Sequence, residues 1–133
     1  MKRLIPAVLL LLLTLAVSPA PAQVQLSDSA KISLLTASPW HGAVYALFGH
    51  TAIFVQDDST GVNAVFNYGY FDSSQPNFIY HFVRGETDYI LGVTSFQDFL
   101  SEYAHRGQQV IAQELNLSPD KKQQLYEALS VNA

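Results

Sequence analysis

The 133-residue sequence contains no cysteine, so the chain itself can form no disulfide bond and offers no thiol nucleophile. Basic side chains are also few, with 7 Lys and Arg against 11 Asp and Glu, which gives a formal net charge of −4. A surface of that sign does not attract a phosphate backbone, so the composition argues against nucleic acid as a partner. The Gly-x-Ser-x-Gly elbow that carries the nucleophile of many serine hydrolases is absent too.

Long apolar runs are absent except near the N-terminus. Residues 4–17 form an almost unbroken apolar run, after Lys2 and Arg3 and before a small-x-small pattern that ends at Ala22. This three-part pattern predicts a cleavable signal peptide over residues 1–22, and therefore export from the cytoplasm. A retained membrane anchor is the alternative, but the run is shorter than the roughly 20 residues that a spanning helix needs. Removal of 22 residues from 133 would leave 111, enough for one domain with a single core.

The rest of the sequence predicts an α+β domain. Residues 23–31 are polar and rich in Ser and Asp, which predicts a flexible leader, and the domain proper is expected over residues 32–133. Apolar runs, period-two alternation and turn residues predict strands at residues 31–36, 50–55, 62–70, 89–94 and 110–117. Helical spacing and capping signals predict helices at residues 96–105 and from residue 119 onward, whereas residues 77–83 fit either a helix or a strand. We therefore expect an antiparallel sheet with packed helices.

The most informative single residue is a histidine. His50 directly follows Gly49 at the start of a predicted strand, where the sheet would hold its backbone and leave its imidazole at the open end. Imidazole takes up and releases protons near neutrality, so this placement suits a general base. The alternative is a structural histidine that is hydrogen-bonded at the end of a strand. His41, His81 and His105 show no spacing typical of a metal site, and the sequence predicts neither a metal nor another cofactor.

Two further segments hold candidate substrate-binding residues. Asn67 and Tyr68 are neighbours on a predicted strand, so they lie on opposite faces and only one can share a face with His50. That side chain could orient the imidazole or line a cleft; a buried tyrosine beside a glycine bulge is the alternative. Arg84 stands between an aromatic run and a glycine, where it could bind an anionic head group. Pairing with the acidic residues at positions 86 and 88 is the simpler interpretation.

Five motifs of the sequence occur in the order in which they occur in one protein family: ISLLTASP, LFGHTAIFV, VFNYGYFD, NFIYHFVRGETDYIL and LNLSPDKKQQLYEAL. Through them the chain resembles, from residue 32 to residue 129, the Lnb-type N-terminal periplasmic domain family, which contains a bacterial lipoprotein N-acyltransferase. The resemblance implies a permuted papain-like fold related to NlpC-type enzymes, a periplasmic location, and His50 as the catalytic histidine. In such an enzyme a cysteine thiolate takes an acyl group as a thioester, which the N-terminal amine of a lipoprotein then attacks. The implied partner is a lipoprotein or a phospholipid acyl substrate at the membrane surface.

One feature of that family is missing. The segment after the last predicted helix should lead to an Asn-Cys motif that holds the nucleophile, and this chain ends at Ala133 without it. We therefore expect that this chain is the N-terminal part of such a domain and that it is inactive as given. It would be either a fragment of a longer gene product or a short paralogue. A missing C-terminal segment of the same gene product is then a further expected partner. Two other functions stay open, a papain-like cell-wall peptidase or amidase and a non-catalytic periplasmic binding module.

Overall fold

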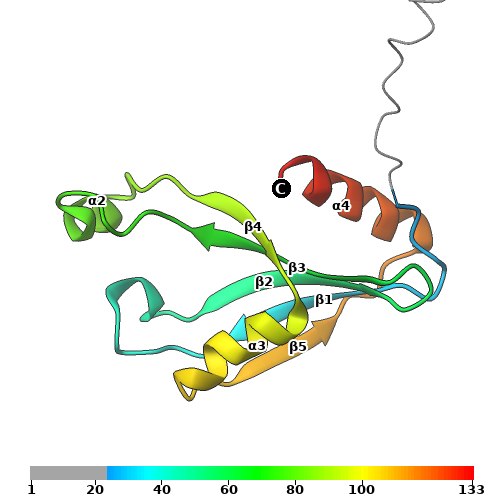
Figure 1. The fold of residues 1–133 in the computed structure, drawn as a ribbon, viewed down its shortest axis with the longest axis horizontal. Helices are drawn as coiled ribbons and strands as arrows, with labels where there is room; N and C mark the ends of the chain where they lie inside the picture. Colours follow the sequence, from blue (N-terminus) through cyan, green and yellow to red (C-terminus); the bar gives the residue numbers. More distant parts are fainter. Residues whose placement is uncertain (1–23) are drawn as a thin grey trace, which may run out of the picture.

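The computed structural model describes residues 24–133, so the predicted signal peptide lies outside the described residues. The described chain forms a five-stranded sheet in the order β4-β3-β2-β1-β5, and every neighbouring pair of strands is antiparallel. The elements follow one another as β1 (Lys31–Ala37), η1 (Val44–Ala46), β2 (His50–Asp57), β3 (Val62–Tyr70), α2 (Phe78–Arg84), β4 (Ile90–Thr94), α3 (Phe96–His105), β5 (Val110–Glu114) and α4 (Pro119–Val131). This arrangement, drawn in Figure 1, confirms the predicted α+β class with an antiparallel sheet.

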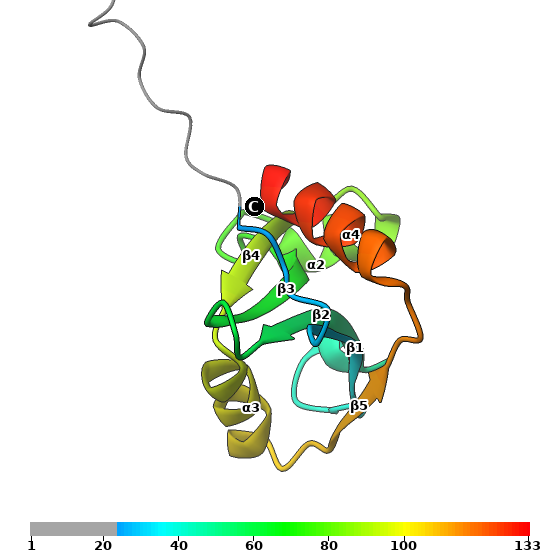
Figure 2. The same cartoon turned by 90° about the vertical axis from the view of Figure 1, so that its right-hand side faces the viewer.

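Helices cover both faces of the sheet, because the strands alternate their apolar side chains between two cores. On β2, Ala52 and Phe54 belong to the cluster that α3 covers, whereas Val55 belongs to the cluster that contains Leu129 of α4. The view in Figure 2 shows α3 and α4 on opposite sides of the sheet. A strand that is apolar on both faces is expected where both faces are covered. The two sets of alternating residues in 50–55 therefore face two separate cores, and neither side of this strand is a solvent-exposed face.

Helix α3 begins where the sequence predicts it. The Ser95 hydroxyl accepts a hydrogen bond from the backbone N–H of Asp98 at 3.1 Å, which satisfies one of the free donors of the first turn. The helix then packs Phe99 and Tyr103, which are 2% and 5% exposed, onto the sheet. Phe96 stacks on Phe54 of β2 with ring centroids 4.4 Å apart. The helix is thereby held against β2 and β3, the two strands that carry the candidate residues.

The segment before β1 differs from the expected flexible leader. Leu26 and Ala30 are buried in the α4-side cluster, and the backbone N–H of Leu26 donates to the side chain of Gln123 on α4. The backbone N–H and the hydroxyl of Ser27 both donate to the carboxylate of Asp57, at 2.7 and 2.8 Å. The polar composition of residues 23–31 favoured a segment without tertiary contacts, but the apolar residues Leu26 and Ala30 pack in the core. These contacts attach the segment to the domain.

The ambiguous segment at residues 77–83 is a helix. Helix α2 begins after Asn77, whose φ is +58°, and ends before Gly85, which caps it with a φ of +72°. Its apolar side packs into an aromatic cluster with η1, the residue after β3 and the residue before β4. The cluster is formed by Tyr45, Phe71, Phe78, Phe82 and Tyr89. Strand β5 ends at Glu114, three residues before the predicted end at residue 117.

Candidate active site

The backbone at the start of β2 explains why a glycine precedes the histidine. Gly49 has a φ of +80°, a conformation that side chains disfavour, and a Cβ on it would lie 2.5 Å from the carbonyl oxygen of Ala37. Ala37 is the last residue of β1 and pairs with His50 across the ladder. The turn therefore brings the chain into β2 close against β1. As a result, His50 starts its strand with a backbone that the sheet holds in place.

The imidazole of His50 is paired with an amide on the neighbouring strand. His50 Nε2 lies 2.6 Å from Asn67 Oδ1, and Asn67 is buried on β3 with 6% of its surface exposed. An amide oxygen can only accept, so this bond requires the imidazole proton on Nε2. The lone pair then resides on Nδ1, which makes no hydrogen bond within residues 24–133. The pair thus fixes the tautomer and leaves one nitrogen free to take a proton.

Two residues beside the His50–Asn67 pair restrict its position: Gly69 leaves space for it, and Tyr103 lies over the imidazole. A Cβ at Gly69 would lie 2.5 Å from His50 Cε1 and 2.8 Å from Asn67 Oδ1, so only glycine fits there without a shift. On the α3 side the Tyr103 ring lies parallel to the imidazole within 7°, with the centroids 6.5 Å apart. Burial raises the pKa of the Tyr103 phenol to about 12, so the phenol stays neutral beside the histidine. The imidazole therefore lies between the backbone of β3 at Gly69 and the neutral ring of Tyr103.

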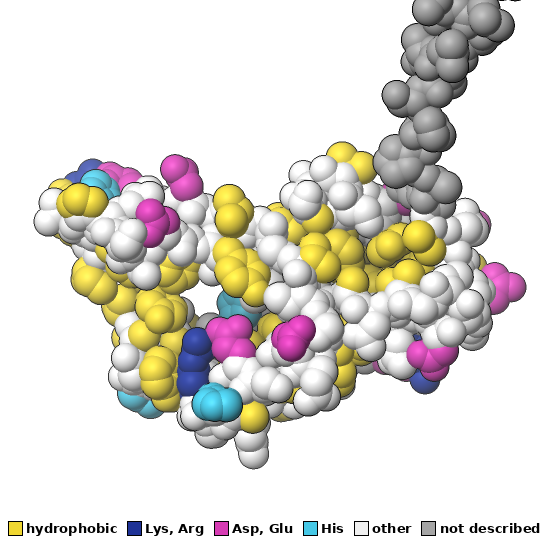
Figure 3. Space-filling model, viewed as in Figure 1, with side chains coloured by type: hydrophobic (Ala, Val, Ile, Leu, Met, Phe, Trp, Pro, Cys, Tyr) yellow, Lys and Arg dark blue, Asp and Glu magenta, His cyan; other side chains and the backbone are white. Residues whose placement is uncertain are grey.

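A cleft of about 470 Å³ opens over this pair. One wall is aromatic and comes from the loops around η1, β3 and α2: Tyr45, Phe71, Phe82 and Tyr89. The other wall belongs to α3 and the loop after it, and it is mostly polar: Glu102, Tyr103, Arg106 and Gln108. Figure 3 shows a hollow between α2 and the part of the molecule below it, with hydrophobic side chains along its edge and charged ones beside it. A buried ligand could therefore meet an apolar surface, a polar surface and a base in one space.

Comparison with known proteins identifies the family. The family model described as the Lnb N-terminal periplasmic domain matches residues 21–132. The chain belongs to this family. No curated protein and no solved structure matches it. The family description supports a periplasmic location for this Lnb-type domain, and no helix in residues 24–133 is long and apolar enough to cross a membrane.

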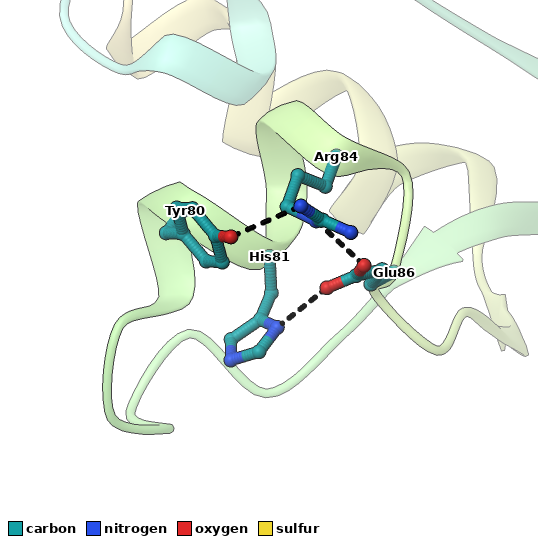
Figure 4. Close-up of polar contacts among 4 residues, drawn as sticks. All are labelled: Tyr80, His81, Arg84 and Glu86. Carbon is teal, nitrogen blue, oxygen red and sulfur yellow. Dashed lines mark hydrogen bonds and ion pairs between the residues drawn. The ribbon is translucent and has the colours of Figure 1, made fainter.

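The Lnb-type domain brings together only some of the predicted site residues. Asn67 faces His50, whereas its neighbour Tyr68 is 54% exposed, although Tyr68 borders the cleft. Arg84 lies on α2 and is not part of the cleft lining. Its Nε donates to Glu86 at 2.6 Å and its Nη1 donates to the hydroxyl of Tyr80 at 3.0 Å, as Figure 4 shows. The pairing with an acidic neighbour, which the sequence favoured, is thus present on the surface.

Glu86 receives two partners in that surface network. Besides Arg84, the Nδ1 atom of His81 lies 3.0 Å from Glu86 Oε2. The hydrogen bond from Arg84, and next the one from His81, lowers the pKa of the Glu86 carboxyl below its usual value. His81 therefore pairs with a carboxylate on the surface, and it is not part of the cleft lining. Within residues 24–133 there is no group of three His, Cys, Asp or Glu side chains that could hold a metal.

Sequence reasoning did not identify the polar wall of the cleft. Glu102 and Tyr103 lie on the amphipathic helix α3, and Arg106 is its C-terminal cap. From the sequence, the tyrosine is expected in the core and the two charged residues are expected to form an i,i+4 pair on the surface. Gln108 lies in the turn after that helix and carries no motif. One signal in the sequence could have indicated this wall. The predicted helix comes directly after the strand β4, and in the fold it packs across the sheet face that carries His50. That signal needs the sheet order, which no local pattern contains.

Proposed function

We propose that this chain supplies the base half of a periplasmic thiol acyltransferase site that acts on bacterial lipoproteins. The observation that carries the proposal is the hydrogen bond between His50 Nε2 and Asn67 Oδ1, which leaves Nδ1 available. An imidazole oriented by an asparagine is the partner of the cysteine in papain-like thiol enzymes. Membership of the Lnb N-terminal periplasmic domain family supports the same chemistry in a periplasmic setting.

In this mechanism His50 acts twice. Nδ1 of His50 takes the proton of a thiol, and the thiolate attacks the acyl ester to form a thioester. The imidazolium gives that proton to the departing alkoxide, which leaves as the alcohol. The amine at the N-terminus of a lipoprotein then attacks the thioester, gives a proton to the imidazole and becomes an amide. The imidazolium passes that proton to the departing thiolate, which restores the thiol and the neutral imidazole. Asn67 keeps the imidazole in the productive tautomer during both steps. The aromatic wall of the cleft gives the acyl chain an apolar surface.

The chain alone lacks the nucleophile for this reaction, because it contains no cysteine. We propose that the chain is inactive by itself and that a further segment of the same gene product brings the thiol to His50. The cleft is the space that such a cysteine would enter. In this proposal the domain is an N-terminal portion of a permuted papain-like unit.

The proposal is tested in bacteria whose lipoproteins keep a free N-terminal amine. One culture produces the chain as it stands, and a second produces it joined to the Asn-Cys segment of a family member. Mass spectrometry of the lipoprotein N-terminus reads out the added acyl group. We expect no product from the first culture, product from the second, and a loss of at least about a hundredfold when the fused protein carries His50→Ala. His105→Ala is the matched control, because among residues 24–133 its ring hydrogen-bonds to the carbonyl of Ser101 alone, and it is outside the cleft lining.

Three results would contradict the proposal. Product from the unfused chain would show that no external thiol is needed, and full activity of His50→Ala would remove the base. A fused protein that is folded by circular dichroism but releases cell-wall fragments instead of acylated lipoprotein would favour the peptidase or amidase. If the fused protein does not fold, the side-chain ¹⁵N shifts of His50 in the unfused chain decide: they must report the Nε2–H tautomer, and Asn67→Ala must abolish that preference.

A further inference from the structure

The polar wall of the cleft holds a guanidinium that the proposed reaction does not use. Arg106 follows α3 directly and lines the cleft, and 27% of its side chain is exposed. Its Cζ atom lies 5.3 Å from the centroid of the Trp40 ring and 5.7 Å from that of Tyr103. Two aromatic rings of different segments therefore contact one cation, which restricts where its charge can go.

Most of the hydrogen-bond donors of the Arg106 guanidinium have no partner among the described residues. Its Nη2 donates to Glu102 Oε1 at 2.8 Å, and this is the one hydrogen bond that the guanidinium makes to residues 24–133. A guanidinium carries five N–H donors, and contacts with the faces of aromatic rings use none of them. Arg84, in contrast, makes two hydrogen bonds on the surface of α2, outside the cleft. Arg106 is therefore the arginine in the cleft lining with donors left for a ligand.

The guanidinium of Arg106 lies near the imidazole of His50. The ring of Tyr103 stacks parallel to His50 and also contacts Arg106, so a single side chain separates the two groups. Gln108 lines the same cleft, and its Oε1 atom is buried without a partner among the described residues. The wall thus places a cation one side chain away from the imidazole. The opposite wall presents aromatic rings.

We propose that Arg106 is an anion subsite that holds the phosphate of a phospholipid while the lipid chains lie against the aromatic wall. Bidentate hydrogen bonds from a guanidinium suit phosphate oxygens, and the rings offer apolar contact for the chains. The proposal rests on the proposed function only in using the same cleft. Glu102 competes with the ligand for the guanidinium and weakens the subsite.

Binding by the protein purified from the periplasm tests this proposal without any catalytic step. Isothermal titration compares short-chain phosphatidic acid below its micelle concentration with a diacylglycerol of the same chains and with inorganic phosphate. We expect phosphatidic acid to bind at least about tenfold more tightly than either of the other two, since each of them lacks one half of the interaction. Added salt should weaken the binding of phosphatidic acid and leave that of diacylglycerol unchanged.

Variants then assign the subsite. Arg106→Gln should weaken the binding of phosphatidic acid by about tenfold or more, because a charge-assisted pair is lost. Arg84→Gln is the matched control, since Arg84 also pairs with a glutamate and lies 5.3 Å from the ring of Tyr80 but is outside the cleft lining. Glu102→Gln should tighten binding by a few fold, because the competing carboxylate is removed. Should Arg106→Gln lose its fold, Glu102→Gln and the comparison of the three ligands still decide.

Each outcome has a defined meaning. Equal affinity for phosphatidic acid and diacylglycerol, or an equal loss in Arg84→Gln, overturns the subsite. Equal affinity for phosphatidic acid and inorganic phosphate shows an anion site without a lipid and overturns the assigned ligand. His105→Ala, whose ring is outside the cleft lining, should leave all three affinities within about twofold, which corresponds to less than 1 kcal/mol. Because no catalytic step enters this measurement, a failed subsite leaves the base intact, and a failed base leaves the subsite intact.

Discussion

The sharpest test of the site geometry is to add one carbon at Gly69. In Gly69→Ala the new Cβ would lie 2.5 Å from His50 Cε1 and 2.8 Å from Asn67 Oδ1. Carbon atoms prefer separations of about 3.5 to 4.0 Å, so the imidazole must retreat by roughly 1 Å. The present hydrogen bond of 2.6 Å would then stretch beyond the usual hydrogen-bond range. The substitution should separate the histidine from its asparagine without removing either side chain.

The magnitude follows from two contributions. Loss of the hydrogen bond costs about 1 kcal/mol of unfolding free energy, and overpacking in a closed space costs about 1 to 3 kcal/mol more. A total of about 2 to 4 kcal/mol lowers the melting temperature of a domain of this size by roughly 10 °C. In the fused protein described above, a displacement of about 1 Å at the base should reduce acyl transfer on the order of a hundredfold.

Thermal unfolding by circular dichroism and the side-chain ¹⁵N shifts of His50 measure these effects. Gly85→Ala is the matched control, because a Cβ there meets nothing within 4 Å although its φ is +72°. That control should lose about 1 kcal/mol through backbone strain and leave the His50 shifts unchanged. If Gly69→Ala keeps both the His50 shifts and the melting temperature of the parent within about 2 °C, the inferred contact between Gly69 and the pair is wrong.

Three further predictions concern stability. The backbone hydrogen bond from Ser27, first among several, lowers the pKa of Asp57 from 3.8 to about 2, so this carboxylate stabilises the fold above pH 3.8 and the contribution is lost as the pH falls toward 2. Urea titrations across that range should show a steeper loss of stability for the parent than for Asp57→Asn; equal slopes would contradict the contact. Burial raises the pKa of Tyr103 to about 12, so stability should fall as the pH rises from 10 to 12, and Tyr103→Phe should remove that loss in alkaline melts. Phe99→Ala should lower the unfolding free energy by about 3 to 5 kcal/mol in urea, because Phe99 is buried between α3 and the sheet, and a loss below about 1 kcal/mol would refute its place in the core.

Local patterns predicted most of the elements in the described chain. The predicted strand at residues 62–70 and the predicted helix at residues 96–105 have the bounds of β3 and α3. These segments carry strong signals, namely alternation beside a polar turn in one case and a serine cap followed by helical spacing in the other. The short segments were harder. Residues 77–83 hold too few turns for a periodic signal, and aromatic contacts with Tyr45 and Phe71 favour the helix.

The leader shows the limit of composition as a guide. Residues 24–30 are mostly polar, yet Leu26 and Ala30 fill places that α4 and the strands leave open. Their burial depends on two elements at opposite ends of the chain, and no window of sequence contains both. The buried Asp57 then satisfies the N–H of Ser27, so the polar part of the segment is attached as well.

For the candidate site, the sequence by itself determined the chemistry that is available. It placed His50 after a glycine at the start of a strand, put either Asn67 or Tyr68 on the same face, and excluded a thiol from this chain. Tertiary structure decided which groups meet. Antiparallel pairing of β2 with β3 selected Asn67, and the return of α3 across that face added Tyr103 and Arg106. Side-chain identity is local information, whereas the distance between side chains depends on strand order and register, which only the packed chain sets.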